Sequence, residues 1–171
     1  RPVEDVVEEI LFSREEYGIK DIAFYDDALL FQGEKHFLPL LKRLEELSLG
    51  LRFHLPNAIH PLYVTPQMAQ LMKKVGFKTL RMSLETSSPL WQEKTGGKVD
   101  NYAFEKATRC FLDAGFTPQE IEVYLLFGLP GISEEEMINS IKYVKSLGLR
   151  PRLALYSPIP HTPDYYKIEG L

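Results

Sequence analysis

Short apolar segments with the residue types of a buried strand alternate along this chain with longer segments of helical periodicity. The clearest case is residues 123–136, where an apolar run ends at a turn flanked by Gly128 and Gly131. Ser133, followed three residues later by Glu136, has the pattern of a capping box, so a helix is predicted to begin there. A strand that turns directly into a capped helix is half of a β/α unit, and repetition of that unit constrains the fold.

Five such strands are predicted, and helices separate them. The predicted strands cover residues 21–27, 50–55, 77–86, 123–127 and 153–156, and the predicted helices cover residues 2–17, 34–49, 65–76, 100–114 and 133–147. We expect a polar loop at residues 87–100. Alternation without a hairpin predicts parallel strands joined by right-handed crossovers. The predicted fold is therefore α/β, with about five β/α units of a partial (β/α) barrel in a single domain over residues 1–171.

The composition excludes several kinds of protein. An apolar fraction of 44% and a charged fraction of 26% are ordinary for a globular domain. The net charge of −4 argues against a nucleic-acid partner, which a basic stripe would indicate. No apolar run reaches the roughly 18 residues of a membrane span, and no signal peptide opens the sequence. The single cysteine, Cys110, excludes an internal disulfide framework and a cysteine-only metal site, and it favours a reducing, cytoplasmic location.

Charged and polar side chains fall on one face of the predicted strands, because alternate residues of a strand share a face. In residues 77–86, Arg81, Ser83 and Glu85 alternate with apolar residues, which we expect to meet the helices. The same alternation puts on the polar face Arg52, His54, Glu122, Tyr124, Arg152 and Tyr156, and on the apolar face Leu51, Phe53, Val123, Leu125, Leu153 and Leu155. Unpaired buried charges would cost on the order of several kcal/mol each. They therefore either pair in a salt-bridge network or surround a polar ligand cavity, which we favour.

Two acidic residues, Asp26 and Asp27, end the first predicted strand. At the carboxyl end of a barrel strand they are placed to bind a metal ion or a ligand's hydroxyl or ammonium group; otherwise they form a solvated turn. No histidine metal site is expected, because His54 and His60 lie too far apart for a helical pair. Residues 95–98 are interpreted as a flexible loop, since the spacing of a phosphate-binding loop is missing.

Five segments of the chain, in this order and spacing, resemble the radical S-adenosylmethionine (radical SAM) superfamily, especially its cobalamin-binding-domain-associated branch. They are residues 2–10, 24–27, 83–86, 127–131 and 156–163, so the resemblance covers the whole chain. It implies a partial barrel of six units, of which this chain lacks the first strand and its loop. In the superfamily, three cysteines of that loop hold a four-iron four-sulfur (4Fe-4S) cluster. We therefore expect a piece of a longer protein, with a further domain upstream and an open sheet edge through which the piece self-associates.

The resemblance also implies a function. The intact protein would be an enzyme that uses the cluster and S-adenosylmethionine to form a 5′-deoxyadenosyl radical, which abstracts hydrogen from a substrate. Cobalamin is a further cofactor that this branch implies. This chain alone would be inactive, since Cys110 cannot replace the three missing cysteines. Neither the substrate nor the reaction type follows from the resemblance, because one fold hosts many reactions.

Carried over to this sequence, the resemblance implies cofactor contacts at two strand ends and two turns. Tyr25 and Asp26 would lie near the methionine part, and Ser83 and Glu85 near the ribose or the amino-acid end. The residues that would flank the adenine, largely through backbone groups, are Leu126, Gly128, Gly131, Ser157, Pro158 and Ile159. Those that would line the cofactor or substrate space are His54, Asn57, Arg81, Glu122 and Arg152. Where the superfamily usually has glycine, this chain has His161, which is expected to alter the backbone at that turn.

Two other interpretations stay open. A metal-dependent (β/α) barrel hydrolase or lyase would use Asp26, Asp27, Glu85 and His54, and it predicts tight binding of a divalent metal by this chain alone. A non-catalytic, degenerate barrel would serve as a binding module. The sequence upstream of Arg1 separates these hypotheses, because only the radical SAM hypothesis requires a C-x-x-x-C-x-x-C motif there.

Overall fold

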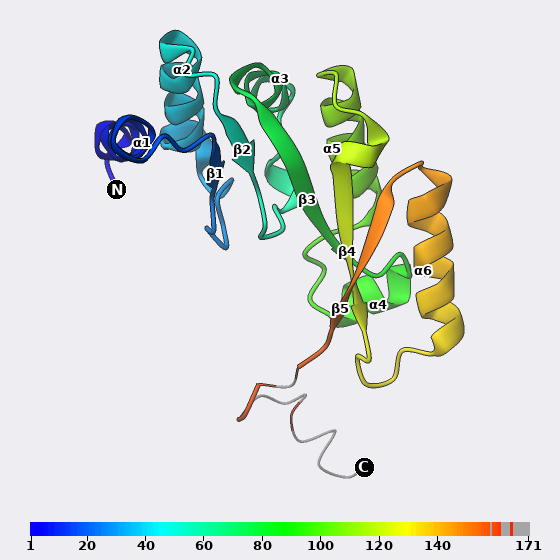
Figure 1. Ribbon diagram of the computed structural model, residues 1–171. Coiled ribbons are helices and arrows are strands. Elements are labelled where there is room, and N and C mark those ends of the chain that lie inside the picture. The colour runs from blue at the N-terminus through cyan, green and yellow to red at the C-terminus, as the bar shows by residue number, and fades with distance from the viewer. Residues whose placement is uncertain (158, 162–164, 166–171) are drawn as a thin grey trace.

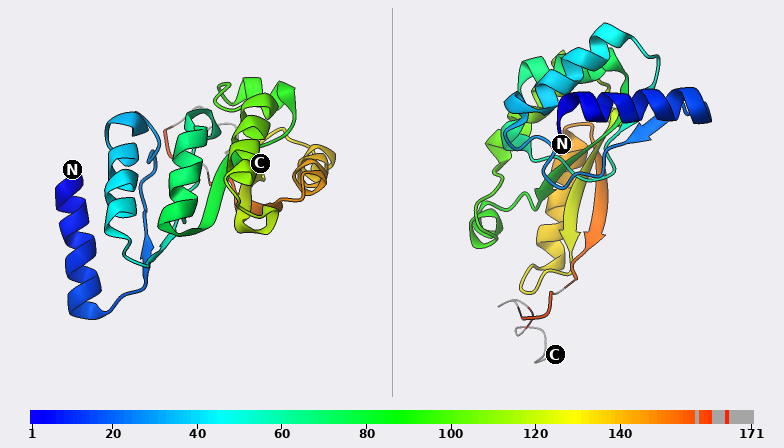
Figure 2. Two further views of the ribbon diagram at one scale, coloured as in Figure 1. Left: turned by 90° about the horizontal axis from the view of Figure 1, so that it is seen from above. Right: turned by 90° about the vertical axis from the view of Figure 1, so that its left-hand side faces the viewer.

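The chain forms a curved, five-stranded parallel sheet with helices along its outer side (Figure 1, Figure 2). The computed structural model describes residues 1–157, 159–161 and 165. Strand order follows chain order, and every pairing is parallel, which confirms the predicted α/β class. The strands are β1 (Asp21–Ala23), β2 (Arg52–His54), β3 (Phe77–Glu85), β4 (Ile121–Phe127) and β5 (Arg150–Leu155).

The helices begin and end close to the predicted residues. They are α1 (Val3–Tyr17), α2 (Phe37–Leu47), α3 (Pro66–Val75), α4 (Pro89–Lys94), α5 (Asn101–Asp113) and α6 (Glu134–Ser146), with short 3-10 helices at Gly33–Lys35, Pro61–Tyr63 and Pro118–Glu120. Within the described part of the chain, no helix combines the length and the apolar character that a membrane crossing requires.

Side-chain caps fix helix starts where the sequence predicts them. Thr65 Oγ1 accepts a hydrogen bond from Met68 N at 3.2 Å, at the start of α3. The start of α6 has the full capping box, with Glu136 N donating to Ser133 Oγ at 3.2 Å and Ser133 N donating to Glu136 Oε2 at 3.1 Å. These bonds satisfy backbone N–H groups that have no partner inside the helix, so each helix start is fixed locally.

Two sequence-based expectations were wrong, one about a loop and one about the end of a strand. Residues 87–100, expected as a polar loop, contain the helix α4, which begins with proline at its first position. Its one buried residue is Gln92, so no apolar periodicity announced it. Residues 24–27, expected as the end of a strand, lie beyond β1, and only Phe24 N continues the ladder, to His54 O at 3.0 Å.

Aromatic rings form the core between the first three strands and α2. Phe53 and Phe77 stack with ring centroids 5.4 Å apart, and Phe24 stacks on Phe77 at 6.0 Å. Phe37 meets Phe77 edge-on at 6.2 Å. On β3, the predicted helix-facing residues Leu80, Met82 and Leu84 are all buried. The helices therefore cover the apolar face of the sheet and leave the polar face open.

The last strand departs from this rule. Leu153 and Leu155, expected to meet helices, are 51% and 70% exposed. Their partners on β4 are Leu125 and Phe127, so they lie on the face that helices cover elsewhere. The reason is that β5 is the last described element, so only α6 lies beside its outer face (Figure 1).

We expect the substitution Leu155→Ser to change the free energy of unfolding of this chain by less than about 0.5 kcal/mol, because the side chain is already in water. The matched substitution Leu125→Ala, at a buried position on the neighbouring strand, should cost about 2–5 kcal/mol. Urea denaturation of both variants tests this difference. Equal losses would show that Leu155 is covered in solution.

Candidate functional site

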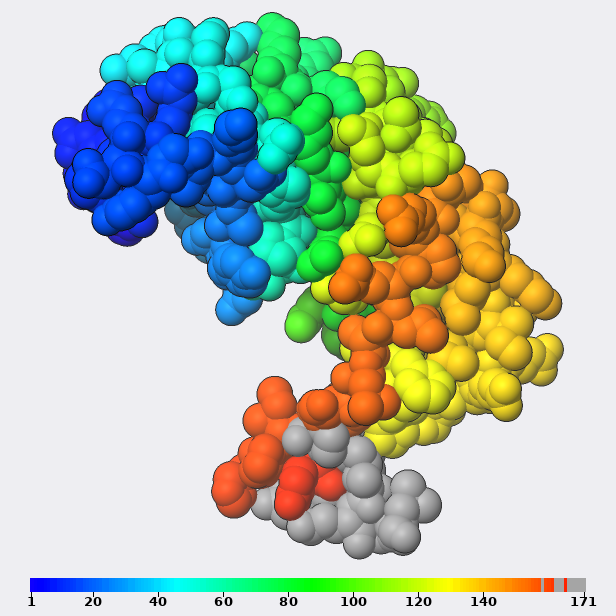
Figure 3. Space-filling view, in the orientation of Figure 1, coloured from blue at the N-terminus to red at the C-terminus, as the bar shows by residue number. Residues whose placement is uncertain are grey.

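Two adjoining cavities open at the carboxyl ends of the strands, the edge at which parallel β/α folds place their sites. The larger, here the turn cavity, has a volume of about 710 Å³ and is lined by Glu85, Trp91, Lys94, Thr95, Gly96, Leu126, Leu129, Pro130 and Tyr156. The smaller, here the loop cavity, has a volume of about 350 Å³ and is lined by Asp27, Pro56, Asn57, Ala58, Ser83, Glu85, Tyr124, Leu126 and Ala154. Both include Glu85 and Leu126, so we treat them as one site, the edge cleft. Figure 3 shows the molecule hollowed between its N-terminal half and the end of β5.

Glu85 occupies the junction of the two cavities in an unusual backbone conformation. Its φ is +66°, in the left-handed region that residues other than glycine rarely adopt. The pairing of β3 with β4 shifts register between Ser83 and Glu85. Such an irregularity at a strand end re-aims a side chain, and backbone strain of this kind gathers at functional positions.

A charged network lies on the polar face of the sheet, next to the loop cavity. Arg81 Nε donates to Glu122 Oε2 at 2.8 Å, and another Arg81 nitrogen donates to Pro56 O at 2.7 Å. Arg152 donates to the same Glu122 oxygen at 3.1 Å, and Tyr124 Oη donates to Pro56 O at 3.4 Å. The side chains of Arg81 and Glu122 are only 18% and 15% exposed. Arg81, Glu122 and Arg152 thus form a salt-bridge network, the alternative that we did not favour, and other residues line the cavity beside them.

Electrostatics within this network favour the ionised carboxylate. Burial acts to raise the pKa of Glu122, but the hydrogen bond from Arg81 and the charges of Arg152, Arg81 and Arg150 outweigh it. The pKa of Glu122 therefore lies below its ordinary value. Neither Arg81 nor Glu122 lines the two cavities, so their contact with substrate stays a prediction. The hydrogen bonds described above indicate a bracing role, in which Arg81 holds Glu122 and the Pro56 carbonyl in place.

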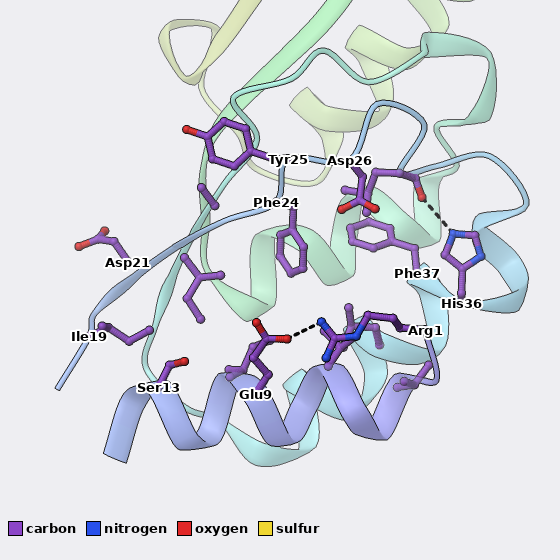
Figure 4. Close-up of a pocket in the computed structure, with 17 residues that line it drawn as sticks. Arg1, Glu9, Ser13, Ile19, Asp21, Phe24, Tyr25, Asp26, His36 and Phe37 are labelled. Carbon is purple, nitrogen blue, oxygen red and sulfur yellow. Dashed lines mark hydrogen bonds and ion pairs between the residues drawn. The ribbon is translucent and has the colours of Figure 1, made fainter. Parts of the chain in front are cut away.

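Asn57 brings an acidic residue into the loop cavity. Its Nδ2 donates to Tyr25 O and to Asp27 Oδ1, each at 2.9 Å. Asp27 therefore faces the cleft, whereas Asp26 and Tyr25 line a separate groove between α1, β1 and α2 (Figure 4). That groove has a volume of about 460 Å³ and a largely apolar floor that includes Phe24 and Phe37. The structure thus places Asp27, and not Asp26, in the lining of a cavity that Glu85 also borders.

The other predicted polar residues lie farther down the polar face. Arg52 forms a two-bond ion pair with Asp21, and His54 Nε2 lies 3.0 Å from the same carboxylate. These bonds, first that of Arg52 and then that of His54, hold the pKa of Asp21 well below its usual range. His54 Nδ1 also meets Thr79 Oγ1 at 3.0 Å. In the described residues no three histidine, cysteine or acidic side chains converge on a possible metal site.

The turn cavity contains residues that sequence reasoning missed, above all Trp91 and Lys94 of α4. At Gly131, where φ is +90°, a Cβ would stand 2.8 Å from the Trp91 ring. The Nζ of Lys94 lies 4.4 Å from the centre of the same ring. Glycine is therefore needed at position 131 for two reasons: the positive φ, and the lack of space for a Cβ beside Trp91. The Trp91 ring packs α4 against the turn after β4.

The remaining predicted residues differ in how they relate to the two cavities. Leu126 lines both cavities, while Gly128, with φ of +81°, and Gly131 shape the turn without lining either cavity. Ser157 and Ile159 are outside the lining sets, Ile159 is exposed, and Pro158 falls outside the described residues. His161, at the position usually glycine, has a φ of +69°. This left-handed conformation is one that glycine adopts without strain.

Comparison with known proteins gives one family and several partial relatives. The family model described as the radical SAM superfamily matches residues 1–144. A curated protein of Pyrococcus horikoshii, named "Uncharacterized methyltransferase PH0819", is 26% identical over 165 residues, which are 94% of this chain and 34% of the relative. This chain therefore spans about a third of that relative's length.

Solved structures support the fold. The radical S-adenosylmethionine methyltransferase TsrM from Kitasatospora setae, with cobalamin and a [4Fe-4S] cluster bound, has a TM-score of 0.80 and 21% identity; the match covers 98% of this chain and 33% of TsrM. Coproporphyrinogen III oxidase (HemN) from Escherichia coli, named as a radical SAM enzyme, has a TM-score of 0.60 and 18% identity over 77% of this chain and 31% of HemN. At these identities the likeness concerns the parallel α/β architecture.

Proposed function

Because the chain belongs to the radical SAM superfamily, we propose that its edge cleft binds S-adenosylmethionine, with Glu85 at the middle of the ligand. The position of Glu85 supports this proposal most directly, since it borders two adjoining cavities in a strained conformation. S-adenosylmethionine has an adenine at one end, an amino acid at the other and a ribose between them. A carboxylate at the junction is placed to accept hydrogen bonds from the ribose hydroxyls.

The two cavities suit the two ends of this ligand. In the turn cavity, Trp91, Leu126 and Leu129 offer apolar surface for an adenine, beside the backbone of the turn after β4. In the loop cavity, Asp27 is placed to pair with an ammonium group, and Asn57 fixes its carboxylate. We assign the adenine to the turn cavity and the amino-acid end to the loop cavity. Contacts of Tyr25, Asp26, Ser83, Ser157 and Ile159 with the cofactor stay proposals that the superfamily suggests.

The residues of this chain do not fit a 4Fe-4S cluster. Its single cysteine, Cys110, lies on α5, and burial raises the pKa of its thiol, which disfavours the thiolate that iron requires. We therefore propose that the ligands of a cluster belong to a longer polypeptide. Cobalamin is bound in TsrM, and we propose it as a cofactor of the intact protein without assigning it any residue of this chain.

For the intact protein we propose radical SAM chemistry, with methyl transfer as the reaction class. Two observations support methyl transfer: the curated relative and TsrM are both named methyltransferases. In this superfamily S-adenosylmethionine supplies a radical that acts on substrate. The proposed role of this chain is to bind and orient the cofactor with Glu85, Asp27 and the turn after β4. A ligand bound in this cleft would displace water from it.

Calorimetric titration of the purified chain tests the proposed site. We expect saturable 1:1 binding of S-adenosylmethionine and of S-adenosylhomocysteine, and no tight binding of Mg²⁺, Mn²⁺ or Zn²⁺. Tight metal binding without nucleoside binding would favour the hydrolase or lyase hypothesis instead. If neither class of ligand binds, the proposal is wrong.

A further inference from the structure

The segment that follows Glu85 is held by a buried polar network. Thr86, Gln92 and Ser140 are all buried, although each is polar. They come from the residue directly after β3, from α4 and from α6. Every buried polar side chain in the described part of the chain has a hydrogen-bond partner, as a stable interior requires.

Ser140 is the centre of one half of this network. Its Oγ accepts a hydrogen bond from Ser87 N at 2.9 Å and donates to Glu136 O at 3.1 Å. It also lies 3.1 Å from Ser87 Oγ and 3.4 Å from Thr86 Oγ1. A side chain on α6 thus ties down two consecutive residues that are more than fifty positions earlier in the chain.

Gln92 and Asn101 complete the other half. Gln92 Nε2 donates to Thr86 O and to Asn101 Oδ1, both at 2.8 Å, and Asn101 Nδ2 donates to Ser87 O at 2.9 Å. Both carbonyl groups after Glu85 are therefore fixed by side chains. The backbone N–H groups of Thr86 and Ser87 are fixed as well, because Thr86 N donates to Leu84 O at 2.8 Å and Ser87 N donates to Ser140 Oγ. The next N–H group, that of Ser88, donates to Thr86 Oγ1 at 3.1 Å.

We propose that Ser140, Gln92 and Asn101 are positioning residues that hold Glu85 in its left-handed conformation, with its carboxylate at the junction of the two cavities. A strained residue keeps its conformation only where the surrounding structure over-determines it. The four backbone groups of Thr86 and Ser87 are all bonded, which leaves the chain after Glu85 little freedom to relax. The inference rests on the proposed role of Glu85 in binding, whereas its conformational part stands independently.

The chain provides a close control for the substitution Ser140→Ala. Thr108 is also a helical residue with a buried hydroxyl group, 5% exposed against 2% for Ser140. It likewise donates to the carbonyl four residues earlier, Phe104 O, at 2.9 Å. This bond lies within α5, away from Thr86 and Ser87, so Thr108→Ala removes a similar hydroxyl without touching the network.

Two measurements on the whole chain test the proposal. In Ser140→Ala we expect NMR couplings that depend on φ to show residue 85 leaving the left-handed region, and affinity for S-adenosylmethionine to fall about tenfold or more. Thr108→Ala should leave both unchanged. An unaltered φ together with unaltered affinity in Ser140→Ala would overturn the proposal. If the parent chain does not bind the cofactor, the proposed function fails, while the NMR result still decides the positioning role.

A second variant covers the case in which Ser140→Ala does not fold. Asn101→Asp keeps the size of the side chain and removes the N–H donor to Ser87 O. Asn101 is the first residue of α5, where a carboxylate is favourable to the helix, so folding should be retained. The same change in φ at residue 85 is expected. A left-handed residue 85 in this variant would count against the network.

Discussion

Replacing Glu85 by glycine is expected to stabilise the chain relative to Glu85→Ala and to weaken the binding of S-adenosylmethionine strongly. Alanine at this position keeps the φ of +66°, which is unfavourable to any residue with a Cβ. Glycine adopts it freely, so Glu85→Gly should be more stable than Glu85→Ala by about 1 kcal/mol. Both variants lose the carboxylate, and affinity should fall by about a hundredfold in each. Urea denaturation and calorimetry measure the two effects.

Ser48 provides the control for this pair. It ends α2 with a φ of +47° and is not among the residues that line the cleft. Ser48→Gly should therefore also be more stable than Ser48→Ala, and neither substitution should change the affinity for S-adenosylmethionine. If Glu85→Ala is as stable as Glu85→Gly, the strand end is not strained in solution. Unchanged affinity in both variants would refute the placement of the cofactor beside Glu85.

Replacing Arg81 by methionine should cause one of the largest losses of stability in the molecule, about 3 kcal/mol. The change leaves the Glu122 carboxylate and the Pro56 carbonyl without their short bonds to the guanidinium. The loss should depend on pH. Since the folded-state pKa of Glu122 is lowered, its pairing stabilises the fold at neutral pH and is lost as the pH falls through that pKa. The penalty of Arg81→Met should therefore shrink in acid.

Arg52→Met is the matched control for Arg81→Met. Arg52 also projects from the polar face of the sheet and pairs with an acidic residue, Asp21, but both side chains are about half exposed. Exposed ion pairs contribute little to stability, so this variant should unfold close to the parent chain. Equal losses for the two arginines, or a loss at Arg81 that does not vary with pH, would contradict the bracing role of Arg81.

Periodicity and capping patterns were enough to predict the parallel α/β sheet. The start of α6 shows why: a capping box and an apolar run are local signals, and the chain bears them out. The segment after Ala23 could not be predicted in this way. Once regular pairing ends, alternation no longer decides which of Asp26 and Asp27 faces the cleft, and the hydrogen bond from Asn57 decides it instead.

The polar network around Ser140 was beyond prediction for a related reason. Its members come from the segment after β3 and from α4, α5 and α6, and no sequence period links them. Gln92 is buried because its amide bonds the chain after Glu85, whereas helical patterns register buried apolar residues. For Leu153 and Leu155 the prediction of burial was wrong. Their alternation is typical of a strand with one covered face, but the elements that cover a strand are not encoded in the strand's own residues.

The uneven pairing of the sheet gives the molecule two halves of different firmness. β4 pairs with β3 at five residues, with one register shift, and with β5 at six, whereas β1 and β2 share three pairs and β2 meets β3 at only two, also with a register shift. Local opening should therefore start at β1 and β2. The loop cavity takes Asp27 and Asn57 from that weaker half and Glu85 and Tyr124 from the firmer one. A ligand in the loop cavity that contacts residues of both halves would stabilise them jointly. Ligand binding should therefore make the unfolding of the two halves more cooperative.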